Sequence, residues 1–495
     1  MPTGPSHDGH EGEDMQVTGP TTNAAMASSM DITQPGSTAR VIMIVAAAAL
    51  GGFLFGFDTA VINGAVDALR DSFGLSAGWT GFAVSCALLG SALGAWYAGR
   101  LADRFGRVRT MQVAAVLLAV SALGAGLAHS VAALILWRLI GGIGVGVASV
   151  VAPTYIAEVS PARIRGRLGS MQQLAIVLGI FVALLSDAWL ASVAGGAEHM
   201  LWLGLEAWRW MFLAMLVPAL VYGVLVLGVP ESPRHLVARS RPHDALRVLR
   251  QVLGMTDEEA LQRKLGDIEQ SLRREHKPRW SDLLGKSGLL PIVWVGIALS
   301  VFQQFVGINV IFYYSSTLWH SVGFSEADAF AITVITSVIN VLVTLVAIAL
   351  VDRIGRKPLL VIGSGGMALT LAVMAWCFAQ ASGSGAALVL PEPWGPVALV
   401  AANAYVIFFG LSWGPVVWVL LGEMFPNRIR AMALAVAAAA QWLANFAITS
   451  SFPAMAELSL PFSYGVYAAF ALLSLIFVLR FVRETKGVEL EDMRG

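Results

Sequence analysis

Twelve apolar stretches dominate the chain, and each is long enough to cross a lipid bilayer as a helix. A hydrocarbon core of about 30 Å needs roughly 20 apolar residues in helical conformation. The stretches cover approximately residues 41–65, 79–100, 110–128, 132–153, 168–190, 209–229, 289–319, 327–350, 358–380, 397–421, 432–453 and 462–481. Because backbone polar groups in lipid must bond within their own segment, we expect an all-α polytopic membrane protein with twelve transmembrane helices.

The composition supports this class. Of the 495 residues, 57% are hydrophobic and only 13% are charged, which is not the balance of a soluble domain. The net charge is zero, which argues against nucleic acid as a partner. Cys86 and Cys377 lie in apolar stretches far apart in the sequence, so we expect inert packing residues rather than a disulfide or metal site.

The basic residues predict the orientation in the membrane. The chain has 32 Lys and Arg. All but three lie in the terminal tails or in the loops after even-numbered helices; Arg70 and Arg209 fall on the other side, and Arg138 lies within the fourth helix. Loops rich in Lys and Arg stay in the cytoplasm. We therefore expect a multi-pass protein of the cell (inner or plasma) membrane with both termini cytoplasmic.

The two halves of the chain repeat each other. Asp103–Arg107 follows the second helix as Asp352–Arg356 follows the eighth, and Glu158–Arg165 follows the fourth as Glu423–Arg430 follows the tenth. A third pair, Pro230–Arg234 and Arg483–Lys486, follows the sixth and twelfth helices. The pairs predict two pseudo-symmetric six-helix bundles, and parallel repeats of this kind bind a substrate between them near the membrane midplane.

This repeat defines five predicted regions. They are a disordered cytoplasmic tail without a signal peptide (1–39), a first bundle (40–231), a cytoplasmic helical linker (232–286), a second bundle (287–482) and a cytoplasmic C-terminal tail (483–495). In the linker, Thr256–Glu259 forms a predicted capping box. Leu261, Leu265, Ile268 and Leu272 form one apolar stripe after it, expected to pack on the membrane domain rather than on a partner protein.

The seventh apolar stretch carries amides that are costly in lipid. Gln303, Gln304 and Asn309 lie within it, with Gly307 between them permitting a close approach or a break in the helix. Polar side chains at this depth face a bundle interior or a watery cavity. Two interpretations remain open from this stretch alone: a site for a neutral, hydroxyl-rich ligand, or amides that bond helices to one another.

Five motifs together resemble the sugar porter branch of the major facilitator superfamily, which includes bacterial proton-coupled sugar symporters and animal glucose facilitators. The motifs are Gly99–Arg107, Arg138–Gly146, Pro230–Arg234, Gln303–Asn309 and Gly414–Trp418. The resemblance covers roughly residues 41–490. It implies the fold of that superfamily, transport of a monosaccharide by alternating access and a monomeric functional unit.

The resemblance also assigns a sugar site lined by amides, because an amide offers a hydroxyl both a donor and an acceptor. The implied substrate-binding residues are Gln173, Gln303, Gln304, Asn309, Asn340, Trp418, Gln441, Trp442, Phe55 and Tyr313. Trp442 could equally be a packing aromatic. Ile180 stands where a related xylose symporter has a second Gln, which favours a hexose such as glucose and leaves a pentose such as xylose possible.

Proton-coupled members of this family carry an acid at the position of Asp58, the only acid in the first helix. Burial raises the pKa of a carboxyl and a nearby Arg lowers it, so Asp58 and Arg138 could exchange a proton as they move apart and together. The alternative is a permanent structural ion pair.

Charged residues at the cytoplasmic helix ends form a predicted gate. They are expected to form ion pairs across the two halves when the cytoplasmic side is closed; the alternative is that they only anchor topology. The candidates are Arg104, Glu158, Arg165, Arg353, Glu423 and Arg430.

The resulting prediction is import of a monosaccharide by proton symport, with the sugar, the proton and the bilayer as partners. A proton-independent facilitator and a sugar sensor without transport are the rivals, and a drug antiporter would need an apolar pocket instead of amides. The sequence contains no nucleotide motif, metal-ligand cluster or nucleophile arrangement, so we expect neither catalysis nor a cofactor.

Overall fold

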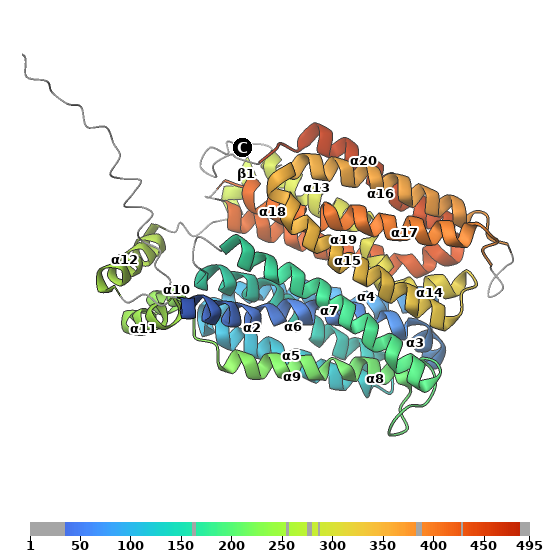
Figure 1. The fold of residues 1–495 in the computed structure, drawn as a ribbon, viewed down its shortest axis with the longest axis horizontal. Helices are drawn as coiled ribbons and strands as arrows, with labels where there is room; N and C mark the ends of the chain where they lie inside the picture. The colour runs from blue at the N-terminus through green and yellow to red at the C-terminus, as the bar shows by residue number, and fades with distance from the viewer. Residues whose placement is uncertain are drawn as a thin grey trace, which may run out of the picture.

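The computed structural model describes residues 35–160, 165–253, 257–274, 280–285, 288–382, 389–426 and 429–485. Twelve helical segments among these residues are long and apolar enough to cross a membrane. They agree with the twelve predicted spans and confirm an all-α, multi-pass membrane protein (Figure 1). The helix α2 begins at Pro35, inside the predicted tail 1–39, and residues 1–34 lie outside the described part.

The first half of the chain, called here the N half, contains helices that run from α2 to α9. They are α2 (Pro35–Ala60), η1 (Asn63–Ala65), α3 (Val66–Phe73), α4 (Ala77–Phe105), α5 (Arg107–Gly126), α6 (Val131–Val159), α7 (Arg165–Ala194), α8 (Ala207–Ala214) and α9 (Leu216–Leu227). The connecting linker contains α10 (Pro233–Ala238), α11 (Pro242–Leu253), α12 (Glu258–Arg274), η3 (Trp280–Leu283) and a short antiparallel pair, β1 (Leu284–Gly285) with β2 (Gly288–Leu289).

The second half, called the C half, repeats the arrangement. It contains α13 (Pro291–Phe305), α14 (Ile308–Ser321), α15 (Glu326–Ile354), α16 (Arg356–Phe378), α17 (Trp394–Leu411), α18 (Trp413–Met424), α19 (Arg430–Leu458) and α20 (Leu460–Phe481). Figure 1 shows the two halves side by side, blue to green below and yellow to red above. They meet along a seam where α4 packs against α19 and α7 packs against α15.

The bundle has two distinct ends. The end that carries α10, α11 and α12 is called the linker end, and the opposite end, near α3, α8 and α14, is called the distal end (Figure 1). Helices cross closely inside each half where glycines remove side chains. A Cβ on Gly56 of α2 would lie 1.9 Å from the carbonyl oxygen of Ile176 on α7, so these backbones touch.

Four predicted spans consist of more than one helical element; in the sixth, the single residue Met215 separates α8 from α9. The first span turns into η1 and α3 after Ala60, the seventh breaks at Gly307 between α13 and α14, and the tenth breaks at Ser412 between α17 and α18. Gly307 has φ +86°, a left-handed conformation that favours glycine. Broken helices expose backbone groups at membrane depth, and transporters place such breaks where a substrate binds.

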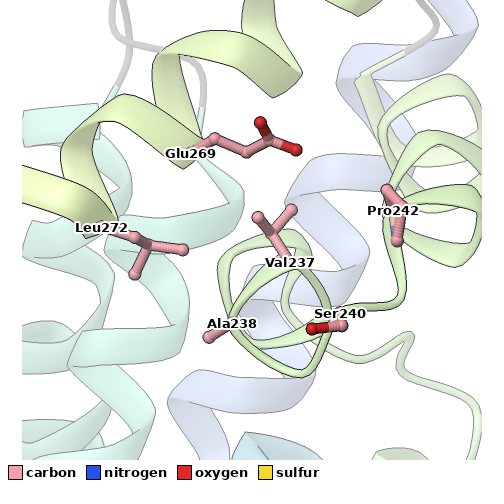
Figure 2. A pocket seen from close by; sticks show the side chains of 6 residues that line it. All are labelled: Val237, Ala238, Ser240, Pro242, Glu269 and Leu272. Atoms are coloured by element: carbon pink, nitrogen blue, oxygen red, sulfur yellow. The ribbon is translucent and has the colours of Figure 1, made fainter.

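The linker helices pack on one another and on the N half. Leu261 and Leu265 of the predicted stripe are buried, α12 packs against α10 and α11, and α11 contacts α2. The cap of α12 is Asp257, whose carboxylate accepts the backbone N–H of Glu259 at 3.1 Å; Thr256 lies outside the described residues. An open recess between α10 and α12 contains none of the predicted sugar-site residues (Figure 2).

Candidate functional site

A chain of hydrogen-bonded amides surrounds the break between α13 and α14. Asn309 Nδ2 donates to Gln304 Oε1 at 2.5 Å, and Gln304 Nε2 donates to Gln303 Oε1 at 3.4 Å. Gln303 and Gln304 are buried, 3% and 5% exposed. The three residues that the sequence singled out therefore form one cluster beside the helix break.

Gln303 also bonds to the broken tenth span. Its Nε2 donates to the carbonyl oxygens of Trp413 at 2.8 Å and Gly414 at 3.3 Å, at the start of α18. Both donors of this amide and its acceptor are thus used inside the protein. Gln303 joins two broken helices, which is the second of the two roles left open by the sequence.

Two tyrosines hold the break at Gly307. The hydroxyl of Tyr405 on α17 donates to the carbonyl oxygen of Val306 at 2.8 Å, satisfying a group that the break removes from the helix. The ring of Tyr467 on α20 lies so close that a Cβ on Gly307 would be 2.7 Å from it.

Gln441 and the aromatic residues lie on the seam. Oε1 of Gln441 on α19 is buried and has no hydrogen-bond partner, so it is an available acceptor. One residue on, the ring of Trp442 lies 5.5 Å from that of Phe55 on α2, joining the two halves. Trp418 is 42% exposed, whereas Tyr313 on α14 is buried.

Four further amides need to be placed: two were predicted as sugar-site residues, and two were not indicated by the sequence. Gln173 on α7 is half-buried, and Asn340 on α15 is buried near Gly410, whose added Cβ would lie 3.6 Å from its Oδ1. Gln172 has a buried Oε1 without a partner, and Asn445 lies one turn after Gln441. Helical spacing from Gln441 could have identified Asn445.

Asp58 and Arg138 are both buried, 5% and 3% exposed; Arg138 is close enough to act on Asp58 through its charge, although no ion pair within 4.0 Å joins them. Arg138 donates to the carbonyl oxygen of Val84 at 3.3 Å, its Nε has no partner, and its guanidinium lies 5.7 Å from the ring centroid of Phe212. Gly141, one turn after Arg138, lies against Asp58: an added Cβ would be 3.6 Å from Oδ1. The acid and the base thus share one region without touching.

The two halves are bonded together at the distal end. Asn63 in η1 donates from Nδ2 to the carbonyl oxygen of Phe312 at 2.9 Å, and the hydroxyl of Ser316 donates to the Asn63 carbonyl oxygen at 2.7 Å. Nearby, the backbone N–H of Ala197 donates to Glu326 at 2.9 Å. These bonds close the seam at this end.

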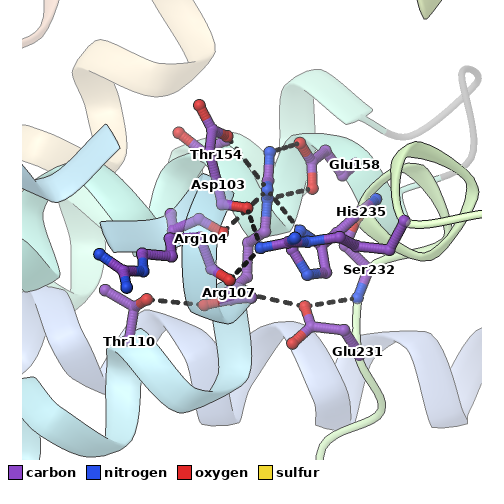
Figure 3. Close-up of polar contacts among 12 residues, drawn as sticks. Asp103, Arg104, Arg107, Thr110, Thr154, Glu158, Glu231, Ser232 and His235 are labelled. Atoms are coloured by element: carbon purple, nitrogen blue, oxygen red, sulfur yellow. Dashed lines mark hydrogen bonds and ion pairs between the residues drawn. The ribbon is translucent and has the colours of Figure 1, made fainter. Parts of the chain in front are cut away.

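At the linker end of the N half, Arg107 is the centre of a network (Figure 3). Its guanidinium binds Glu158 through two bonds of 3.0 Å and also donates to Asp103 at 3.3 Å and to Nδ1 of His235 at 3.2 Å. Glu231 accepts the backbone N–H of Arg107 at 2.9 Å, at the N-terminus of α5. Burial, reinforced by Arg107 and opposed by Glu231, lowers the pKa of His235.

The C half repeats this network. Arg356 binds Glu423 through bonds of 3.1 and 2.7 Å, and Glu484 accepts the backbone N–H groups of Arg356 and Lys357, both at 2.9 Å. Thr485 donates to Glu423 at 2.6 Å. Equivalent residues of the two repeated motifs therefore make equivalent bonds in the two halves.

Within the part of the chain that the structure describes, the two acids among the predicted gate residues do not bond across the halves. Glu158 and Glu423 bind Arg107 and Arg356 of their own halves, the last residue of each repeated Asp-Arg motif, which was not among the candidates. Arg104 and Arg353 are exposed, and the Arg104 guanidinium lies over the Phe105 ring at 5.4 Å.

Of the two other gate candidates, Arg165 and Arg430, the structure describes the side chain of Arg430 alone. The side chain of Arg165 lies outside the described residues. Arg430 donates from Nε to the carbonyl oxygen of Phe425 at 3.1 Å, its Nη2 is buried without a partner, and burial lowers its pKa.

Comparison with known proteins gives one consistent family. The model of the family "Sugar (and other) transporter" matches residues 44–494. A glucose transport protein of Synechocystis sp. is 56% identical over 92% of this chain and 97% of its own length, and the D-xylose-proton symporter of Escherichia coli is 38% identical over 93% and 96%. The inward open structure of the E. coli xylose transporter XylE superposes with a TM-score of 0.78, at 38% identity, over 92% of this chain and 99% of that one. The chain belongs to the sugar transporter family of the major facilitator superfamily.

Proposed function

We propose that this protein imports a monosaccharide, with a hexose such as glucose favoured, by proton symport through alternating access. The observation that carries the coupling is the arrangement of Asp58 and Arg138, which are buried in one region without a direct ion pair. Burial disfavours the carboxylate, whereas contact with Arg138 would favour it, so we infer that Asp58 holds a proton while the two groups are apart. The glucose transport protein and the xylose-proton symporter among the relatives support the substrate class and the coupling.

We propose that the linker end faces the cytoplasm, because almost all Lys and Arg lie on that side. The bonds of Asn63 and Ala197 then close the outer side, and the arrangement is the inward-facing one. In this state the linker-end arginines bind acids of their own halves. Pairing of the gate residues across the halves would belong to the outward-facing state.

The sugar would bind on the seam between Gln441 and the amides at the break in the seventh span. The free Oε1 of Gln441 accepts a hydroxyl, and Gln173, Gln304, Asn309 and Asn340 supply further donors and acceptors. Phe55, Trp418 and Trp442 supply flat faces for the C–H surface of the ring, and Tyr313 closes the outer side. Gln303 contributes by holding Gln304 in place, since its own groups are already bonded.

The coupling residue is tested with Asp58→Asn in proteoliposomes. One proton moving down 100 mV supplies about 2.3 kcal/mol, enough for roughly fifty-fold accumulation of a neutral sugar. We expect the variant to lose this accumulation while counterflow of labelled glucose continues, because the neutral amide resembles the protonated acid. Thr59→Ser, a neighbour on α2, serves as the control. Accumulation that survives in Asp58→Asn would remove the assignment and favour a different coupling residue.

A further inference from the structure

A second acid is buried in the membrane domain and has no role in the mechanism above. Asp187 on α7 is 0% exposed and lies seven residues before the distal end of that helix at Ala194. Its Oδ2 accepts the backbone N–H of Gly64 at 3.3 Å, and its Oδ1 is buried without any partner. The contact with η1 is tight, since a Cβ on Gly64 would lie 2.8 Å from Asp187 Cβ.

No cation neutralises this acid among the residues that the structure describes. The helices packed against α7 are α2, α6, α8 and α15, with η1. The charged groups that these elements carry away from the linker end are Asp58, Arg138, Arg209, Glu326 and Asp328. Arg138 donates to a carbonyl of α4, Arg209 pairs with Glu206 at 2.5 Å, and Glu326 accepts the N–H of Ala197. A buried carboxylate without a counter-ion is strongly disfavoured, so Asp187 in this arrangement is the neutral acid.

The same short segment joins this acid to the distal closure. Gly64 donates to Asp187, and the adjacent Asn63 makes the bonds to Phe312 and Ser316 of the C half. Opening the distal end has to break the Asn63 bonds. The three-residue η1 then loses the contacts that hold it over Asp187, and water gains access to the carboxyl.

We propose that Asp187 is a second protonation site, which takes a proton from the distal-side solution when that end closes and returns it when that end opens. This proposal rests on the proposed function, because it assumes that the distal end opens and closes during transport. The carboxylate plus one proton gives the neutral acid, and the reverse step releases the same proton to the same side. Asp187 therefore adds no proton to the transported stoichiometry. It makes acid on the distal side favour the closed arrangement and alkali favour the open one.

The test measures opening directly and needs no sugar. Both native cysteines, Cys86 and Cys377, are buried, so Ala65→Cys places one reporter in η1, where the side chain is 0% exposed in the closed arrangement. All proteins also carry Asp58→Asn, which removes that acid from the pH response. The rate of maleimide labelling from pH 5.5 to 8.0 is compared with and without Asp187→Asn. The ratio of the two rates cancels the titration of the thiol itself.

We expect the ratio of the rate with Asp187 to the rate with Asp187→Asn to rise at least fivefold from pH 5.5 to 8.0. Ser186→Ala, which removes a neighbouring buried hydroxyl without a partner, is the matched control and should leave this rise in place. A ratio that stays constant with pH overturns the proposal, whereas failed glucose counterflow in an otherwise pH-responsive protein would instead count against the proposed function.

A second measurement does not depend on the folding of the Asp187→Asn variant. Dicyclohexylcarbodiimide modifies protonated carboxyls in apolar surroundings, and peptide mass spectrometry locates the product. We expect modification at Asp187 at pH 6 in the Asp58→Asn protein, falling at least threefold at pH 8. An Asp187 that remains unmodified at pH 6, while the protein labels elsewhere, also overturns the proposal.

Discussion

The different states of Gln303 and Gln441 lead to opposite predictions for two substitutions of the same kind. The side-chain amide of Gln303 is hydrogen-bonded to Trp413, Gly414 and Gln304, whereas Oε1 of Gln441 has no partner. Methionine is close to glutamine in length and shape but makes no comparable hydrogen bond. We therefore expect Gln303→Met to lower stability and Gln441→Met to lower sugar affinity.

The magnitudes follow from the bonds. Gln303→Met removes two bonds to α18 and leaves the Gln304 amide without its acceptor, about 1.5–3 kcal/mol in total. Gln441→Met removes a buried polar atom that bonds to nothing in the protein, so the free energy of unfolding should not fall. In the complex it leaves a sugar hydroxyl without its acceptor, about 1–3 kcal/mol, which is roughly a 5- to 150-fold weaker Kd.

Two measurements in detergent separate these effects. Thermal unfolding followed by intrinsic fluorescence should give a lower Tm for Gln303→Met and an unchanged or higher Tm for Gln441→Met. Isothermal titration with glucose should give the larger rise in Kd for Gln441→Met. Equal losses of Tm in the two variants, or an unchanged Kd in Gln441→Met, would refute the argument from the free acceptor.

Two further predictions concern single residues. Gly307→Ala should destabilise the protein by about 1–3 kcal/mol, because φ +86° is unfavourable for alanine and its Cβ would meet the Tyr467 ring; a Tm equal to that of Gly465→Ala, where an added Cβ meets nothing, would contradict this. His235 has a lowered pKa, so its neutral ring stabilises the fold above about pH 6.5, and this contribution is lost as the pH falls through the lowered pKa. The Tm should therefore decrease more between pH 7 and 5 than in His235→Gln, and parallel curves would show that the contact with Arg107 is not titrating.

The twelve spans and the repeated halves could be predicted because lipid imposes a strong and simple pattern on sequence. The interruption of the seventh span was foreseeable at Gly307, since glycine tolerates left-handed backbone. The break at Ser412 was not, because serine is common inside helices. Just after that break, the carbonyl oxygen of Trp413 accepts a hydrogen bond from Gln303, which lies 110 positions earlier in the chain. Local sequence does not encode such a contact.

The site was predictable in its residue types and less so in its bonds. The amides of the seventh span form a cluster as expected, but which of them is free depends on the carbonyls of another helix. The linker-end acids are expected to pair across the halves when the cytoplasmic side is closed; in the arrangement seen here each binds an arginine of its own half. Gly106 and Gly355, with φ of +98° and +106°, turn the chain so that Arg107 and Arg356 reach Glu158 and Glu423. Backbone turns of this kind decide which of several arginines meets an acid.

The matched networks at the linker end have a mechanical consequence. Each network joins the ends of several helices of one bundle to the segment that follows the last helix of that bundle. Glu231 makes this connection in the N half and Glu484 makes it in the C half. A bundle clamped in this way resists shearing between its own helices. The reorientation of the carrier must then be absorbed by the short interrupted segments and by sliding along α4 against α19 and α7 against α15, so substitutions there should alter turnover far more than equally drastic changes inside either clamp.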